Sequence, residues 1–161
     1  MTLTILKNAT ISDVKRELSR MLTEGIKSSN VRQLTERAIA GRQDKIGAIF
    51  DFARDTFPYT PDPVGRELFV HPNRVAEDYF QGRVRGLDCD DYALLTGAML
   101  GCIGYQVRLA LLDIDWDNEI DHAISQYYSE PLGEWINCDA SADKPLGWII
   151  QARETIYALS S

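Results

Sequence analysis

Apolar residues recur at helical spacing in three stretches of residues 1–60. The stretches cover residues 12–25, 30–41 and 44–57, and each places its apolar side chains on one face. The apolar positions are Val14, Leu18, Met21 and Leu22, then Val31, Leu34 and Ile39, then Ile46, Ile49, Phe50, Ala53 and Phe57. We predict three amphipathic helices, preceded by a short strand at residues 2–6, where polar and apolar side chains alternate.

Residues with known preferences for helix ends bound these segments. Ser12 and Asn30 are plausible N-caps, because their side chains accept hydrogen bonds from free backbone N–H groups. Gly25 and Gly41 are predicted to end the first two helices, and Pro58 to end the third. The basic side chains around the apolar faces are interpreted as solvated helix surfaces rather than as an anion site.

The second half of the chain changes to a strand pattern after one strongly apolar helix. Residues 92–103 are almost continuously apolar, which predicts a buried helix that begins at Cys89. Residues 106–114 are rich in aliphatic side chains, residues 122–128 alternate, and residues 135–138 follow a turn. We therefore predict an α+β fold in which three antiparallel strands pack against the Cys89 helix.

The segment between residues 57 and 86 is punctuated by proline and glycine but is not a flexible linker. It contains a predicted short helix at residues 73–80 and several large apolar side chains that need burial. These side chains are Phe57, Tyr59, Leu68, Phe69, Tyr79 and Phe80. We expect one domain over residues 1–161, with a core at residues 44–148 and an N-terminal helical extension at residues 1–43.

The charge balance excludes some classes of function. The 161 residues include 17 Lys and Arg against 24 Asp and Glu, and residues 1–60 have a net charge of +3 while residues 61–161 have −10. A protein that binds nucleic acid would show the opposite balance, so no nucleic-acid partner is expected. No apolar run approaches the roughly 18 residues of a membrane span, and no secretory signal is visible. We expect a cytoplasmic protein with no membrane partner.

The three cysteines differ in their surroundings and do not form a disulfide framework. Cys102 lies in the apolar helix and Cys138 in a predicted strand, so both are expected in the core. Cys89 begins a helix, where backbone N–H groups and the helix dipole stabilise a thiolate, the nucleophilic form. Such a cysteine is more often structural, and only its partners make Cys89 a candidate nucleophile.

Three carboxylates surround this cysteine: Asp88, Asp90 and Asp91. Nearby negative charge raises the pKa of a thiol and so opposes the effect of the helix. We expect Asp88 to cap the helix, and one of the other two to turn away or to pair with an arginine. The candidate arginines are Arg83, Arg85 and Arg108.

Three residues follow one another in an order that matches a nucleophile, a base and an orienting carboxylate. They are Cys89, His122 at the start of a predicted strand, and Asp139 at the end of the next strand. Together with the run Phe57–Pro63 before the cysteine, this order resembles the transglutaminase-like superfamily, whose core is related to papain-type cysteine proteases. The resemblance covers about residues 44–148. Asp139 and Ala140, followed by Pro145, Leu146, Gly147 and Trp148, are similar to compact versions encoded in phages and prophages.

The resemblance implies a thioester mechanism in which Cys89 is the nucleophile, His122 the general base and acid, and Asp139 the residue that orients the imidazole. It implies a protein or peptide substrate and no cofactor, and it leaves hydrolysis, deamidation and transamidation open. Leu87 stands where the family usually has Gly, so we expect its side chain to narrow the turn. The alternative is a phage virion or tail-assembly protein that binds phage structural proteins with little or no catalysis.

The remaining candidate ligands have structural interpretations. His71, before Pro72, is interpreted as structural, and two histidines with dispersed cysteines do not make a zinc site. The acidic residues between Asp113 and Asp121 are superficially similar to a calcium loop. However, Ile124 stands where the bidentate Glu belongs, and no Gly occupies the sixth place. We expect a solvated acidic loop beside the site and no metal.

Overall fold

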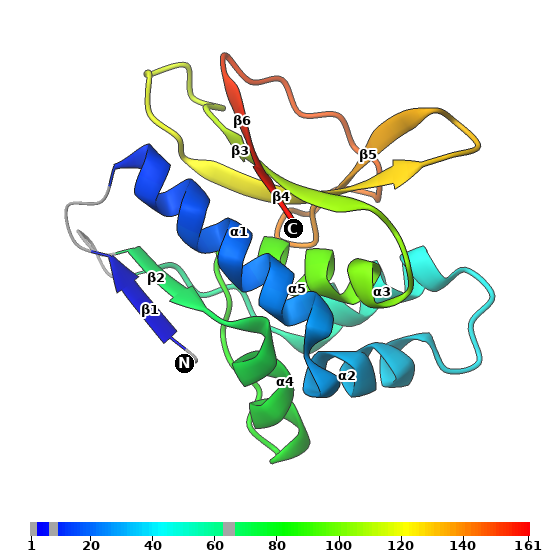
Figure 1. Cartoon of the computed structure of the whole chain (residues 1–161). Helices are drawn as coiled ribbons and strands as arrows, with labels where there is room; N and C mark the ends of the chain where they lie inside the picture. Colours follow the sequence, from blue (N-terminus) through cyan, green and yellow to red (C-terminus); the bar gives the residue numbers. More distant parts are fainter. Residues whose placement is uncertain (1–2, 7–9, 63–66) are drawn as a thin grey trace.

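The computed structural model describes residues 3–6, 10–62 and 67–161, so Thr2 and Pro63 lie outside the described residues. In chain order the elements are β1 (Leu3–Leu6), α1 (Ile11–Lys27), α2 (Ser29–Ile39), α3 (Lys45–Thr56), β2 (Glu67–Val70), α4 (Pro72–Phe80), α5 (Cys89–Cys102), β3 (Val107–Leu112), β4 (His122–Ser129), β5 (Glu134–Cys138) and β6 (Thr155–Leu159). The sheet of β3 to β6 forms one layer and the helices pack beneath it (Figure 1). The α+β architecture is as predicted.

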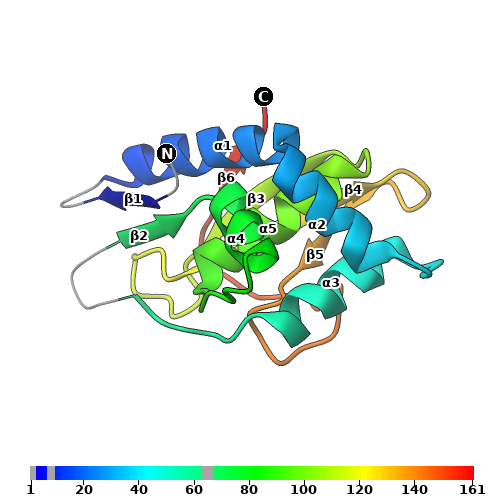
Figure 2. The same cartoon turned by 90° about the horizontal axis from the view of Figure 1, so that it is seen from below.

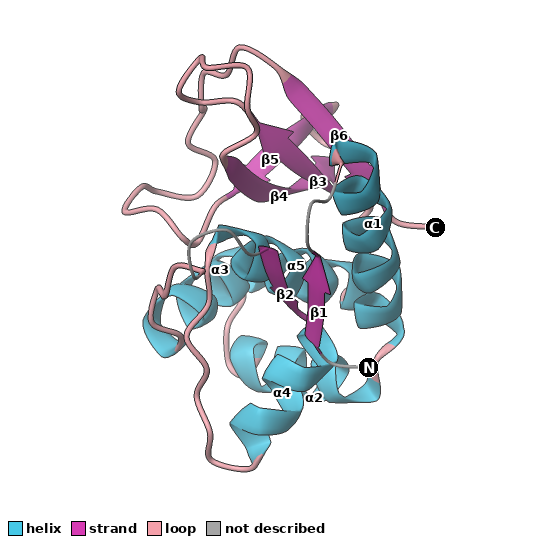
Figure 3. Ribbon diagram, turned by 90° about the vertical axis from the view of Figure 1, so that its left-hand side faces the viewer, coloured by secondary structure: helices cyan, strands magenta, loops and turns pink. Residues whose placement is uncertain are grey.

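Helix α5 lies at the centre of the molecule. It is buried on all sides because its residues from Tyr92 to Leu100 are apolar or small around the whole helix. Strands β3 and β4 cover one side of α5, and α1 to α4 pack on the other sides (Figures 1 and 3). Figure 2 shows the molecule from below, the side on which α1 to α4 lie. Neither α5 nor any other helix in the described ranges is long and apolar enough to cross a membrane.

The main sheet is antiparallel, in the order β5-β4-β3-β6. Leu112 is opposite His122 in β3 and β4, and Ser125 is opposite Cys138 in β4 and β5. This register places the start of β4 and the end of β5 at the same end of the sheet. Three strands were predicted, and β6, which pairs with β3, adds a fourth.

A second, two-stranded sheet joins the N-terminus to the centre of the chain. The predicted N-terminal strand is present as β1, and it pairs antiparallel with β2, which was not predicted. Val70 at the end of β2 donates its N–H to Asp91 in the first turn of α5, at 2.9 Å. The small sheet is therefore tied to the start of the central helix.

The helix starts in the first half differ from the predicted caps. Thr10, not Ser12, caps α1, in a reciprocal capping box with Asp13. Ser28, not Asn30, caps α2 by accepting the N–H of Val31. In both cases a hydroxyl residue two positions upstream satisfies free N–H groups, so the helices begin earlier than predicted.

The predicted helix ends are partly wrong. Gly25 does not end α1, which continues to Lys27, and Gly25 is instead a point of close packing. A Cβ at this position would lie 3.0 Å from Ala98 Cβ and 3.0 Å from Pro72 Cγ, which explains why glycine is needed. Gly41, with φ of 73°, does follow the end of α2, and Pro58 follows the end of α3 as predicted.

Candidate active site

Cys89 is the first residue of α5, as predicted, and its position results from the cap before it. The carboxylate of Asp88 accepts the N–H of Asp91 at 3.1 Å, and the Asp91 carboxylate accepts the N–H of Asp88 at 3.2 Å. This capping box satisfies two N–H groups of the helix start. In the described part of the chain the N–H of Cys89 has no hydrogen-bond partner, so it is available to a ligand.

The Cys89 thiol lies in an environment that disfavours its charged form. Burial raises its pKa most, and the charges of Asp90 and Asp88 raise it further. The backbone N–H of Ala123 in β4 hydrogen-bonds toward the sulfur and lowers the pKa, but by less than the other effects raise it. Together these effects raise the pKa of the Cys89 thiol and favour its neutral form.

His122 and Asp139 form a hydrogen-bonded pair at the end of the sheet. The His122 Nε2 atom lies 2.7 Å from Asp139 Oδ2. Asp139 is buried, which raises its pKa, but hydrogen bonds from His122 and from the side chain and N–H of Ser141 outweigh burial and hold the pKa below its ordinary value. The carboxylate is charged at neutral pH, and because it accepts from Nε2, the Nδ1 atom of His122 is left as the basic nitrogen.

One pocket joins the cysteine and the histidine. The cavity has a volume of about 210 Å³, and Cys89 and His122 both line it. The other lining residues are Ile11, Val14, Tyr59, Pro61, Asp62, Asp88, Asp90, Leu111, Ile120 and Asp121. Through the His122–Asp139 hydrogen bond, the structure therefore brings all three predicted site residues to one place.

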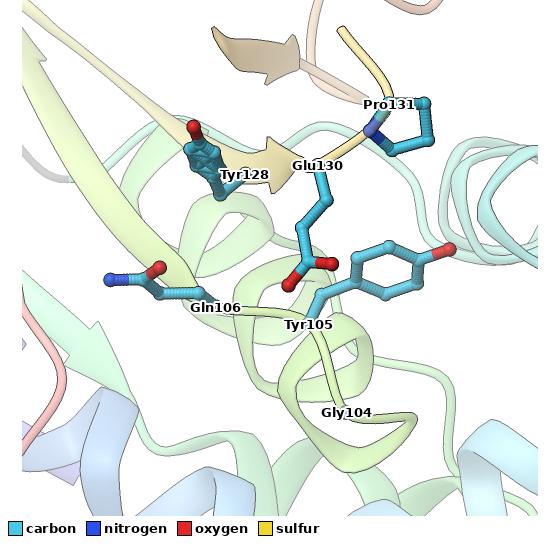
Figure 4. A pocket seen from close by; sticks show the side chains of 6 residues that line it. All are labelled: Gly104, Tyr105, Gln106, Tyr128, Glu130 and Pro131. Carbon is cyan, nitrogen blue, oxygen red and sulfur yellow. The ribbon is translucent and has the colours of Figure 1, made fainter. Parts of the chain in front are cut away.

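A larger hollow lies at the opposite end of α5 (Figure 4). Its volume is about 540 Å³, and it is lined by Gly104, Tyr105, Gln106, Tyr128, Glu130 and Pro131. These lining residues include neither a cysteine nor a histidine. Of these two pockets, the smaller one at the start of α5 is the one that contains a thiol and an imidazole.

The three candidate arginines bind groups other than Asp91, for which pairing with an arginine was one of two expected alternatives. Arg83 and Arg85 both bind Asp78, at 3.0 and 2.6 Å. Arg108 lies against the rings of Trp135 and Tyr157, 4.1 and 3.7 Å from their centroids. Asp91 instead accepts backbone N–H groups in the capping box, and the carboxylates beside Cys89 keep their effect on its pKa.

Leu87 does not narrow the turn before Cys89, contrary to expectation. Its side chain is fully buried in the core, and it does not line the pocket. Its backbone pairs with the upstream segment, donating to the Pro58 carbonyl at 2.9 Å and accepting from the Thr60 N–H at 2.8 Å. The departure from the family pattern at this position therefore changes the core, not access to Cys89.

The acidic loop between β3 and β4 lies beside the pocket but is not fully solvated. Asp113 is completely buried and binds Arg153 at 2.5 Å, while its carboxylate accepts the N–H groups of Asp117 and Asn118. Asp121 accepts two further backbone N–H groups and lines the pocket. The carboxylates thus shape the loop by binding its own backbone.

The residues interpreted as structural occupy structural positions. Cys138 is buried in the core, and Cys102 is half-buried with its thiol donating to the Ile26 carbonyl at 3.4 Å. His71 caps α4, because its Nδ1 accepts the N–H of Asn73 at 3.0 Å. Its Nε2 lies 3.3 Å from Glu24, away from the pocket lining.

Sequence reasoning missed Tyr59 and Asp62 as parts of the pocket. Burial and the neighbouring Asp88 raise the pKa of Asp62 to about 6, although the Leu68 N–H opposes this shift. The only signal was their place in the proline-rich run before the cysteine, which identified the segment but not its side chains.

The described residues include two clusters of carboxylates whose oxygens lie within 4.8 Å of one another. One consists of Asp62, Asp88 and Asp90, and the other of Asp113, Asp117 and Asp121.

Solved structures with this fold come from several bacteria. A proposed cysteine protease from Cytophaga hutchinsonii matches 98% of this chain, with a TM-score of 0.56 and 15% sequence identity. A proposed protease from Parabacteroides distasonis matches 81% of this chain, with a TM-score of 0.51 and 15% sequence identity. This chain covers only 53% and 26% of those two proteins. For calcium-bound LapG from Legionella pneumophila, the match covers 96% of this chain and 88% of the LapG chain, with a TM-score of 0.55 and 16% sequence identity. Comparison with curated proteins gives no match.

The family comparison agrees with the fold. The family model of the transglutaminase-like superfamily matches residues 29–140, from the start of α2 to just beyond Asp139. The match covers more than half of the chain and includes the whole of α5, β3, β4 and β5. The chain therefore belongs to the transglutaminase-like superfamily.

Proposed function

We propose that this protein catalyses cysteine-dependent acyl transfer on amide substrates, with Cys89, His122 and Asp139 as a triad. The observation that carries the proposal is the 2.7 Å hydrogen bond between His122 and Asp139 at a pocket whose wall also contains Cys89. A nucleophile, a base and a group that orients the base are the minimum for this chemistry. Membership of the superfamily supports the same assignment.

In the proposed mechanism the sulfur of Cys89 attacks the carbonyl carbon of the amide. Because burial and the neighbouring carboxylates keep the thiol neutral, its proton passes to His122 Nδ1 during the attack rather than beforehand. Asp139 holds the ring through Nε2 and stabilises the imidazolium that forms. His122 then returns the proton to the leaving nitrogen, and the C–N bond breaks to leave a thioester on Cys89.

The start of α5 supplies a donor for the developing oxyanion. The N–H of Cys89 has no partner among the described residues, and it points from the positive end of the helix dipole. A preorganised N–H group at this place stabilises negative charge on the carbonyl oxygen as the sulfur adds. The thioester is then released by water, in hydrolysis or deamidation, or by an amine, in transamidation.

Charge around the pocket favours a basic protein or peptide as substrate. Asp62, Asp88, Asp90 and Asp121 line it, and residues 61–161 carry a net charge of −10. A negative field raises the local concentration of positively charged partners and their association rate. We therefore include a lysine-bearing peptide or acceptor in the proposal.

The proposal also includes calcium, because LapG has been solved with calcium bound. The carboxylates of Asp62, Asp88 and Asp90, which lie within 4.8 Å of one another beside Cys89, offer the hard oxygen ligands that this ion prefers. A cation held there would offset the negative charges that raise the pKa of the thiol. Each assay is therefore run with added calcium and with EGTA.

The test is the rate at which iodoacetamide labels each cysteine at neutral pH, followed by mass spectrometry. We expect Cys89 to react much faster than Cys102 and Cys138, and His122→Ala to remove that difference. Incubation with glutamine-bearing and lysine-bearing peptides, with and without an added amine, then separates hydrolysis, deamidation and transamidation by their mass changes. Equal and slow labelling of the three thiols would contradict the proposal.

A second candidate is a binding module that keeps the fold with little or no catalysis. The raised pKa of Cys89 favours it, because a neutral thiol is a poor nucleophile. The labelling experiment decides between the two candidates. The phage structural partners, the place in a virion and the cytoplasmic location stay predictions, since none of the matched proteins bears on them.

A further inference from the structure

The segment before Cys89 has an open backbone edge at Tyr59, a residue that lines the pocket. Tyr59 forms an isolated parallel bridge with Leu87, in which Leu87 N–H donates to the Pro58 carbonyl at 2.9 Å and Thr60 N–H donates to the Leu87 carbonyl at 2.8 Å. The bridge therefore uses the groups on either side of Tyr59. In extended backbone the N–H and C=O of one residue point to the same side, so those of Tyr59 point away from Leu87.

These two groups are available to a ligand. Among the residues that the structure describes, neither the N–H nor the C=O of Tyr59 has a hydrogen-bond partner. Tyr59 is 54% exposed, and it lines the same pocket as Cys89 and His122. A free N–H and C=O on one extended residue form the hydrogen-bonding unit to which a peptide strand adds.

The edge is held in place from behind. The ring of Tyr59 stacks on the ring of Tyr92 in α5, with centroids 6.5 Å apart and planes within 7°. Tyr92 is buried, and its hydroxyl donates to the carbonyl of Phe57. The same helix that positions Cys89 thus positions the backbone of Tyr59. Because this backbone is already ordered, little conformational entropy is lost when a ligand binds to it.

We propose that Tyr59 binds the main chain of the substrate. An extended segment of the substrate polypeptide lies along residues 58–60 and forms antiparallel hydrogen bonds with the N–H and C=O of Tyr59, which delivers a neighbouring carbonyl to Cys89. The inference rests on the proposed function and narrows its substrate class. The substrate is an extended stretch of polypeptide, and a small amide without a peptide main chain lacks the contact.

Two covalent probes of Cys89 test this contact. Iodoacetamide carries no peptide, whereas a lysine-containing tripeptidyl acyloxymethyl ketone carries a peptide main chain. When the ketone reacts, its methylene carbon forms a bond with the sulfur of Cys89 and its carboxylate leaves. The thiol proton passes to His122. The protein is labelled with ¹⁵N-tyrosine at its seven tyrosines. The Tyr59 amide signal is identified as the one missing from Tyr59→Phe.

Hydrogen exchange of the Tyr59 amide is then compared in the two adducts. We expect exchange to be about tenfold slower in the peptidyl adduct than in the iodoacetamide adduct, because only the peptide covers this N–H group. Tyr105, in the hollow at the other end of α5 (Figure 4), is the matched control and should exchange equally in both. We also expect N-methylation of the probe amide that faces Tyr59 to slow labelling about tenfold, the effect of roughly one lost hydrogen bond.

The outcomes separate this inference from the proposed function. Equal exchange of Tyr59 in the two adducts, with Cys89 labelled by both probes, would overturn main-chain binding at Tyr59 while leaving the nucleophile intact. Failure of both probes to label Cys89 faster than Cys102 would contradict the proposed function, and the inference with it. Exchange that is slower in the peptidyl adduct at Tyr59 but not at Tyr105 supports the contact.

Discussion

At the scale of single residues, Cys89 is subject to opposing electrostatic effects. Its place at the start of α5 and the N–H of Ala123 favour the thiolate, while burial and the charges of Asp90 and Asp88 favour the thiol. The thiol form prevails, so in the proposed mechanism Cys89 depends on His122 to accept its proton. This dependence distinguishes the site from one in which a thiolate is present at rest.

The effect of the flanking charge can be measured with Asp90→Asn. Removal of a negative charge that raises the pKa of Cys89 should lower that pKa, so labelling by iodoacetamide in EGTA at neutral pH should become faster by about three- to tenfold. Glu130→Gln, which removes a charge from the hollow at the far end of α5, should leave the rate unchanged. A rate for Asp90→Asn at or below that of the unmodified protein would contradict the electrostatic account.

The same variant tests whether the acidic cluster holds calcium. If Asp62, Asp88 and Asp90 bind the ion, added calcium should speed the labelling of Cys89 in the unmodified protein by offsetting the charges beside the thiol. Asp90→Asn should lose most of this response, because one of its three ligands no longer carries charge. If Cys89 is labelled at the same rate in calcium as in EGTA, in the unmodified protein as well as in Asp90→Asn, the cluster is excluded as a calcium site.

At the scale of elements, ion pairs connect α4 to the loop that leads to Cys89. Asp78 is buried and binds Arg74, Arg83 and Arg85, two of which lie in that loop. Burial raises the pKa of Asp78, but the three arginines outweigh it and lower the pKa from 3.8 to about 2. The approach to Gly86 and Cys89 is therefore held by one carboxylate.

The pKa of Asp78 predicts a specific loss of stability in acid. A carboxylate whose pKa is lower in the folded than in the unfolded chain stabilises the fold above the unfolded value, and this stabilisation is lost as the pH falls toward the folded value. We expect Asp78→Asn to lower the free energy of unfolding by about 1–2 kcal/mol near pH 6, with screening of the exposed arginines allowed for. The difference should shrink as the pH falls from about 4 toward 2.

Urea titrations of both proteins across this pH range provide the measurement. Asp51→Asn is the control, because Asp51 is exposed and its pair with Arg42 is solvated. That variant should follow the unmodified protein at every pH. A difference between Asp78→Asn and the unmodified protein that stays constant down to pH 2 would show that Asp78 acts through its shape rather than through its charge.

The contact between α1 and α5 depends on the absence of a side chain at Gly25. On helix propensity alone, replacement of an interior glycine should stabilise α1. Because a Cβ would lie 3.0 Å from both Ala98 and Pro72, we expect Gly25→Val to destabilise the fold by about 1–3 kcal/mol, seen as a lower urea midpoint at an unchanged slope. Lys15→Val, on an exposed position of the same helix, should leave the midpoint nearly unchanged.

At the scale of the whole molecule, features set by a few neighbouring residues were predictable, and those set by distant pairing were not. The start of α5 follows from Asp88 as a cap and from the apolar run after it, so Cys89 could be placed from the sequence. His122 and Asp139 followed from strand patterns that end where polar residues begin. Their meeting at one end of the sheet needed the register of β3, β4 and β5.

The features that escaped prediction share a physical cause. β2 and β6 have only four and five residues, and they are strands because β1 and β3, far away in the chain, pair with them. Tyr59 likewise belongs to the site because its backbone bridges Leu87, a contact that no local pattern encodes. The arginines near Cys89 in sequence could not be assigned for the same reason, since Asp78 competes for them.

The uneven charge of the chain leads to a prediction that needs no substrate. Residues 1–60 have a net charge of +3 and residues 61–161 of −10, and four carboxylates line the pocket of about 210 Å³ that contains Cys89. A cationic methanethiosulfonate should therefore modify Cys89 about tenfold faster than an anionic one of similar size at low salt. The ratio should fall toward one in about 0.5 M salt, where the Debye length is only a few ångströms. Cys102, which lies outside this pocket, is the internal control. A ratio at Cys89 that is independent of salt would mean that the charge of residues 61–161 does not select which reagents reach this thiol.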